Sequence, residues 1–114
     1  MDSIQERRRY ERVRLPDTAN VVVCNREGKT IGRVRTIGQG GLAIETEEKF
    51  TQLSRIHIRL VDESEGIRRE LDAAVRYHTP DGIGIEFLGL STDAAVEIGV
   101  IIGKYYSAAH GAGA

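Results

Sequence analysis

The sequence is poor in residues that anchor many small domains. Its 114 residues include no tryptophan, one cysteine, two phenylalanines and four tyrosines. The core of the single domain expected for this length must therefore be aliphatic. The lone Cys24 excludes an internal disulfide and a cysteine-based metal cluster, and its place in the run VVVC indicates a small buried side chain.

Long apolar runs and a large net charge are also missing. No run reaches the ~18 residues of a membrane span, and the charged N-terminus lacks the apolar segment of a signal peptide. The formal net charge is −1, so no overall field draws the chain to a nucleic acid polymer or to a membrane. We therefore expect a soluble cytoplasmic protein.

Patterns typical of catalysis and metal binding are absent as well. None of His57, His78 and His110 has metal-ligand spacing to another histidine, a cysteine or a carboxylate. The sequence contains no nucleophile elbow, no phosphate-loop lysine motif and no matched acid–base pair of carboxylates. We expect a protein without enzyme activity, with no catalytic residue, no metal and no cofactor.

The sequence does contain a series of short segments in which apolar and polar residues alternate. Alternation of this kind indicates strands, and the turns between these segments contain glycine or proline. The six segments are 19–24, 30–37, 42–46, 55–60, 69–78 and 83–87. Tyr77 and Phe87 both fall on inward faces in this scheme. The pattern favours a small antiparallel barrel or sandwich.

After Leu90 the spacing of apolar residues becomes helical. Ser91 or Thr92 can cap the helix, and Asp93, Glu97 and Lys104 mark its polar side. Gly99 and Gly103 leave one side smooth enough for close approach. This helix either packs against the barrel or forms a contact with a partner, including a homodimer contact. The chain then divides into a flexible arm (1–15), a barrel with its helix (16–107) and a flexible tail (108–114).

Two features could form a binding site. Residues 35–42, RTIGQGGL, place three glycines within four positions between two predicted strands, but they lack the spacing of a dinucleotide fingerprint and no helix follows. Alone, this segment is explained by a tight turn. The arm carries Arg8 and Arg12 in R-x-x-x-R spacing. Their guanidinium groups can bind phosphate or the edge of guanine, whereas a solvated basic tail is the simpler interpretation of the arm alone.

Taken together, the arm, the glycine segment and the closing GIGIEFLGLS (82–91) with its helix resemble the PilZ domain family over nearly the whole chain. The resemblance implies a small six-stranded antiparallel β-barrel, all-β with a C-terminal helix, that binds the bacterial second messenger cyclic di-GMP. The family pattern is R-x-x-x-R on the arm and [D/N]-x-S-x-x-G on the barrel. The arm motif falls on Arg8 and Arg12, with Arg7 or Arg9 as a helper.

The second motif is degenerate in this chain. The glycine that ends the family motif falls on Gly41, with Gly40 beside it, whereas Thr36 stands at the Asp or Asn position and Gly38 at the Ser position. These residues complete the ligand-binding set that the resemblance implies, which is Arg7, Arg8, Arg9, Arg12, Thr36, Gly38, Gly40 and Gly41. The loss of both family side chains predicts weaker binding.

The resemblance implies a non-enzymatic receptor whose ligand is cyclic di-GMP. Binding would order the arm across the barrel, and the signal would pass to an unidentified effector protein. The alternative is a PilZ-like adaptor that has lost or weakened nucleotide binding and acts through protein contacts. A third interpretation, a small nucleic-acid-binding barrel, requires exposed stacking aromatics, which the predicted inward positions of Tyr77 and Phe87 disfavour.

Overall fold

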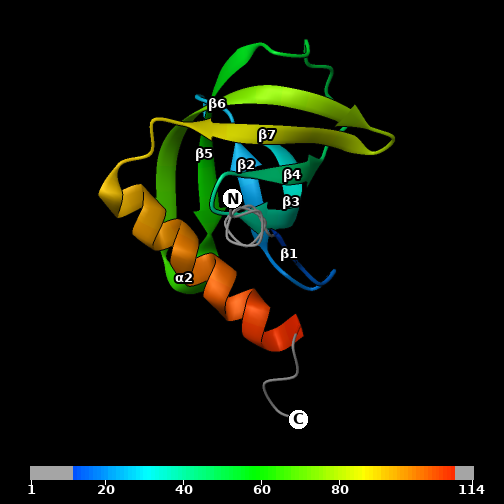
Figure 1. The fold of residues 1–114 in the computed structure, drawn as a ribbon. Coiled ribbons are helices and arrows are strands. Elements are labelled where there is room, and N and C mark those ends of the chain that lie inside the picture. Colours follow the sequence, from blue (N-terminus) through cyan, green and yellow to red (C-terminus); the bar gives the residue numbers. More distant parts are fainter. Residues whose placement is uncertain (1–11, 110–114) are drawn as a thin grey trace, which may run out of the picture.

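The computed structural model describes the backbone of residues 12–109 and the side chains of residues 12–106. Six antiparallel strands close into a barrel (Figure 1), in the order β3-β2-β5-β6-β7-β4 and back to β3. This confirms the predicted fold class. The strands are β2 (Val21–Cys24), β3 (Thr30–Gly38), β4 (Gly41–Glu45), β5 (Arg55–Asp62), β6 (Ile67–Thr79) and β7 (Gly82–Leu88).

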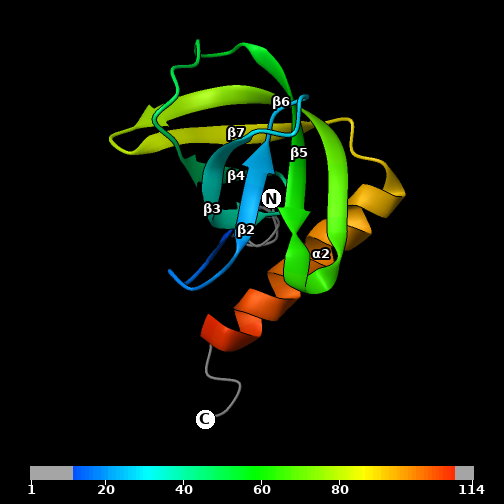
Figure 2. The ribbon, with the colours of Figure 1, turned by 180° about the vertical axis from the view of Figure 1, so that it is seen from behind.

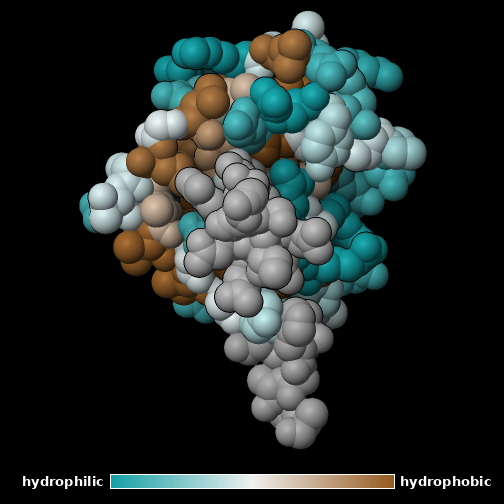
Figure 3. All heavy atoms as spheres, in the orientation of Figure 1, coloured by the Kyte–Doolittle hydropathy of each residue, from teal (hydrophilic) through white to brown (hydrophobic). Residues whose placement is uncertain are grey.

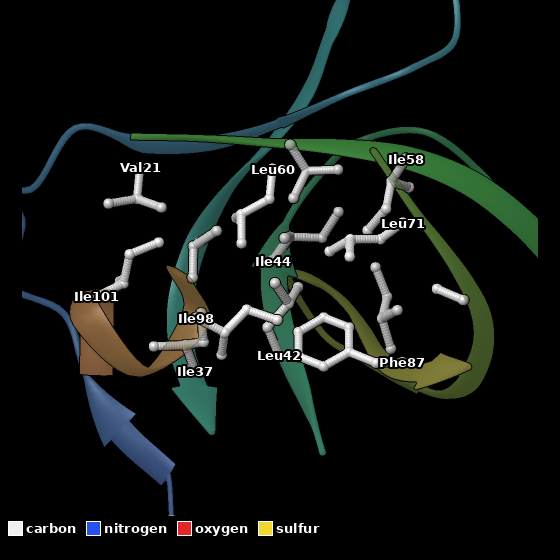
Figure 4. Packing of buried hydrophobic residues seen from close by; sticks show 14 of the residues in the cluster. Val21, Ile37, Leu42, Ile44, Ile58, Leu60, Leu71, Phe87, Ile98 and Ile101 are labelled. Carbon is white, nitrogen blue, oxygen red and sulfur yellow. The ribbon is translucent and has the colours of Figure 1, made fainter. Parts of the chain in front are cut away.

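The barrel interior is filled by aliphatic side chains, as the composition predicts. Alternate residues of each strand point inward. Thus Leu42 and Ile44 of β4, and Ile83 and Ile85 of β7, are almost fully buried. Figure 4 shows how such side chains meet in the centre of the barrel. The aromatic Phe87 joins them at the margin of the core.

One open end of the barrel is covered by α2 (Thr92–Ala109), and the loop between β4 and β5 lies at the other end (Figures 1 and 2). The Ser91 hydroxyl accepts a hydrogen bond from the Ala94 amide at 3.1 Å, so Ser91 caps the helix. Ile98 and Ile101 are fully buried in the barrel core. No helix in the part of the chain that the structure describes has the length and apolar character needed to cross a membrane.

Two of the charged residues that the sequence places on the polar side of α2, Glu97 and Lys104, bind the barrel. Glu97 accepts from Arg69 Nε of β6 at 2.8 Å. The Lys104 ammonium lies 3.7 Å from the buried carboxylate of Asp62, just before the 3₁₀ turn η1 (Glu63–Glu65). These ion pairs hold the helix to the barrel rim at two points about two turns apart, because the rim supplies the opposite charges.

A seventh strand, β1 (Arg12–Arg14), lies within the segment 1–15 that the sequence analysis assigns to the arm. It pairs antiparallel with the end of β3, and the Leu15 amide donates to the Arg35 carbonyl at 2.8 Å. Val13 and Leu15 are buried. The short β2 pairs only with the first part of β3, which leaves the same edge of β3 free beyond that part. The alternation R-V-R-L in residues 12–15 supplies the apolar side chains that are buried at this free edge.

Tyr77 also differs from its predicted inward position. The register of β6 against β7 shifts between Val75, which pairs with Ile85, and Tyr77, which pairs with Gly84. This bulge inserts one extra residue and so reverses the face on which later side chains lie. Val75 is fully buried, whereas Tyr77 is 41% exposed.

Candidate functional site

The pairing of β1 with β3 brings the two predicted motifs together. Arg12 lies opposite Gly38 in the ladder, and Arg14 lies opposite Thr36. Because the Val13–Ile37 pair between them is buried, Arg12 and Arg14 point to the outer face of the barrel. The segments that meet here are more than 20 residues apart in the sequence. Arg7, Arg8 and Arg9 lie outside the described residues.

Small side chains continue this face across the neighbouring strands. Thr36 pairs with Ala43 of β4, Ala43 pairs with Gly84 of β7, and Gly84 pairs with Tyr77 of β6. Ala43 and Gly84 alternate with the buried residues of their strands, so they face outward. We call this surface, made of Thr36, Ala43 and Gly84 with Arg12 and Tyr77 at its sides, the outer-face site.

Tyr77 is the residue of this site that sequence reasoning missed. Its hydroxyl accepts a hydrogen bond from Arg12 Nη1 at 3.0 Å, a contact that spans the sheet from β1 to β6. Its ring lies over Gly84. A glycine inside a strand pattern is a signal of a bulge or of close approach. Gly84 in GIGIEF was therefore the available sign that the simple alternation of β6 fails near Tyr77.

Arg12 and Arg14 differ in their ion pairs from the other arginines near the site. Arg33 and Arg35 share Asp17, with nitrogen–oxygen distances of 3.7 and 3.1 Å. Within residues 12–109, by contrast, neither Arg12 nor Arg14 forms an ion pair, and both are exposed. Two guanidinium groups on one strand, both without a carboxylate, suit an anionic ligand such as a phosphodiester.

Gly40 and Gly41 have a structural role that the sequence did not reveal. A Cβ on Gly41 would lie 2.1 Å from the Ile85 carbonyl oxygen, so the close approach of β4 to β7 requires glycine. The Gly40 carbonyl accepts from the Phe87 amide at 3.0 Å. Both residues therefore hold the β3–β4 turn against β7, at the edge of the outer-face site.

A cavity lies elsewhere, at the barrel mouth opposite α2. It has a volume of about 1100 Å³, and Gly32, Glu45, Phe50 and His78 are among its lining residues. Of the predicted ligand-binding residues that the structure describes, which are Arg12, Thr36, Gly38, Gly40 and Gly41, none lines it. Across the part of the chain described by the structure, no group of three or more histidine, cysteine or acidic side chains could hold a metal ion.

A model of the PilZ domain family matches residues 6–103. The chain belongs to the PilZ domain family. Of the residues that match the PilZ motif, Arg12 from the arm and Thr36 from the barrel belong to the outer-face site, and Gly38 pairs with Arg12 at its edge. Thr36 and Gly38, two positions of the barrel motif, thus lie directly beside β1.

Solved structures are similar to this PilZ chain in fold. The PilZ domain of YcgR from Escherichia coli, whose structure contains c-di-GMP, has 17% identity and a TM-score of 0.71, with 90% of this chain and 94% of that chain covered. The uncharacterized Legionella protein Lpg0364 has 12% identity and a TM-score of 0.62, with 89% of this chain and 99% of that chain covered. The PilZ domain of CeSA from a cellulose-synthesizing bacterium has 19% identity and a TM-score of 0.55, with 81% of this chain and 94% of that chain covered. No curated protein matches the chain.

Proposed function

We propose that this chain is a cytoplasmic PilZ receptor that binds cyclic di-GMP at the outer-face site and signals to a partner protein. The observation that carries the proposal is the β1–β3 ladder, in which Arg12 lies opposite Gly38 and Arg14 opposite Thr36. The YcgR domain, a structural neighbour, contains the same ligand. The guanidinium groups of Arg12 and Arg14 would bind phosphate oxygens and the O6 and N7 atoms of guanine.

The barrel side of the site departs from the family motif, which sets the expected strength of binding. Thr36 offers one neutral hydroxyl where the family has a carboxylate or amide, and Gly38 offers no side chain. A charge-assisted hydrogen bond contributes roughly 1.5–3 kcal/mol and a neutral one about 1 kcal/mol. We therefore expect a loss of about 2–3 kcal/mol, or roughly 30- to 150-fold in affinity, relative to the intact motif.

Signalling would proceed through the residues before β1. Because Arg12–Arg14 pair with β3, the part of the arm that binding would order across the barrel is the part before β1, which includes Arg7, Arg8 and Arg9. Bound phosphates would draw these arginines onto the outer-face site. This would create a new surface for an effector protein.

Calorimetric titration with cyclic di-GMP tests the proposal. We expect binding by the wild-type chain. Arg8→Ala and Arg12→Ala should each weaken it by about 10- to 150-fold, because each removes a charge-assisted contact. Arg55→Ala is the matched control, since Arg55 is an exposed strand arginine outside the site. Absence of both heat and thermal shift at about 100 μM ligand would overturn the proposal.

The barrel half of the site has a separate test. Thr36→Asp combined with Gly38→Ser restores the family side chains and should increase affinity by roughly 30- to 150-fold. If the affinity stays unaltered, Thr36 and Gly38 do not contact the ligand. The receptor proposal would then rest on the arginines alone.

The second candidate is an adaptor that acts through protein contacts without nucleotide. The exposed apolar side chains Val96 and Val100 of α2 favour it, and Figure 3 shows hydrophobic surface on the side of the molecule where α2 lies. The titration separates the two candidates, because the adaptor requires no cyclic di-GMP.

A further inference from the structure

The cavity at the barrel mouth, which we call the mouth groove, has no part in nucleotide binding at the outer-face site. Its volume of about 1100 Å³ lies above the range of about 300–1,000 Å³ that is usual for small-molecule sites, so it is large enough for several side chains of a peptide. The buried Ile31 and Ile83 and the half-buried Phe50 form the apolar part of its lining. Apolar surface of this kind favours a ligand that brings an apolar group of its own.

The walls of the mouth groove are tied together by hydrogen bonds. One wall is the loop between β4 and β5, which lies at the end of the barrel opposite α2 (Figures 1 and 2), and the other is the turn between β6 and β7. The Thr46 amide donates to the Asp81 carbonyl at 3.0 Å, and His78 Nε2 donates to the Phe50 carbonyl at 2.7 Å. The groove is therefore preformed, and binding there requires little ordering of the loop.

The charged residues of the mouth groove give it an excess of negative charge. Four carboxylates and two cations line it. Within residues 12–109 none of the four carboxylates forms an ion pair, whereas Arg33, one of the two cations, lies 3.7 Å from Asp17. The carboxylates are Glu45, Glu47, Glu48 and Asp81, all exposed, and the second cation is Lys49.

This charge decides what kind of occupant the groove accepts. An anion such as cyclic di-GMP is repelled, while a cationic segment is attracted, because complementary charge favours encounter and excludes partners of the wrong sign. Residues 1–11 of this chain do not supply such a segment. Their three arginines, Arg7, Arg8 and Arg9, are balanced by Asp2, Glu6 and Glu11. The occupant therefore comes from another protein.

We propose that the mouth groove binds a basic segment of a partner protein, with lysine or arginine side chains at the four carboxylates and an apolar side chain against Ile31, Phe50 and Ile83. That this partner is the effector of the receptor rests on the proposed function. The preference of the groove for a basic segment does not, because it requires no nucleotide.

Calorimetric titration in the absence of cyclic di-GMP tests the proposal. The probe is the capped peptide RRLRRL, for which we expect saturable binding below about 1 mM. RRGRRG should bind about 5- to 150-fold more weakly, because it lacks the leucine that the apolar lining would bury. EELEEL should not bind. Glu47→Gln combined with Glu48→Gln should weaken the binding of RRLRRL by about 2- to 30-fold, the range of two exposed ion pairs.

The matched control removes two carboxylates at the α2 end of the barrel. Glu63→Gln combined with Asp93→Asn changes the net charge equally, and both residues are exposed; its affinity for RRLRRL should equal that of the wild type. Thermal unfolding shows that both double variants are folded. Equal weakening by the two double variants would reduce the attraction to diffuse charge and overturn the proposal, as would absence of binding by the wild type. The titration with cyclic di-GMP addresses a different surface, so the receptor function can stand when this proposal fails, and the reverse.

Discussion

Gly41 and Gly103 differ in what a methyl group would meet. At Gly41 the added atom would collide with the backbone carbonyl of Ile85 at 2.1 Å, whereas at Gly103 it meets no atom within 4 Å. The backbone of a closed barrel cannot move aside to make room for an added methyl group, whereas a flexible side chain can. Gly41, which the family motif presents as part of a ligand site, is thus first a requirement of strand packing.

Urea unfolding of two alanine variants checks this role. We expect Gly41→Ala to lower the free energy of unfolding by about 1–3 kcal/mol through overpacking. Gly103→Ala, in the exposed face of a helix, should raise it by about 0.5–1 kcal/mol, because alanine has the higher helix propensity. If Gly41→Ala is as stable as the wild type, β4 and β7 can move apart at this position and glycine is not required there.

At the scale of elements, the pairing of β5 with β6 contains a histidine between two carboxylates. His57 of β5 lies opposite Asp72 of β6, with Nδ1 3.1 Å from its carboxylate, and Nε2 contacts Glu70. Arg59 donates to the same Glu70 at 2.6 Å. Hydrogen bonds to Glu70 and then Asp72 raise the pKa of His57 above its ordinary value, against smaller opposing effects of burial and of Arg26. The imidazole therefore links the two strands through its contacts with Glu70 and Asp72.

A pH series of thermal unfolding tests this link. Because folding raises the pKa of His57, protonation of His57 stabilises the native state fully at pH values below its unfolded-state pKa of about 6.5. This stabilisation is lost as the pH rises through the pKa of the folded state. The melting temperature of His57→Gln should therefore fall furthest below that of the wild type near pH 6, and the gap should shrink towards about pH 9. A gap that stays constant with pH would contradict the charged state of His57.

At the scale of the whole molecule, α2 presents opposite properties on its two sides. Glu97 and Lys104 bind the barrel rim, and the outward side carries Val96 and Val100, which are 60% and 44% exposed. Exposed apolar side chains on this side suit a second copy of the same face, because the contact would remove apolar surface from water. The homodimer through α2 stays a prediction.

Light scattering coupled to size exclusion measures this association. We expect a dimer at about 100 μM protein, and a monomer when Val96→Glu and Val100→Glu are combined, because apposed carboxylates repel. Leu53→Glu introduces the same charge at the opposite end of the barrel and should leave the dimer intact. A wild-type chain that remains monomeric over the whole concentration range would exclude this interface.

The sequence by itself determined the six barrel strands, the aliphatic core and the C-terminal helix, because period-two and helical spacing are local properties of the chain. It also indicated the arginine arm and the altered TIGQGG segment, since both are short motifs. Only the tertiary structure decided that Arg12–Arg14 form a strand, because the burial of Val13 depends on a free edge of β3. It likewise decided that Tyr77 faces outward over Gly84 to meet Arg12. A bulge depends on the partner strand, and alternation within β6 alone cannot reveal it.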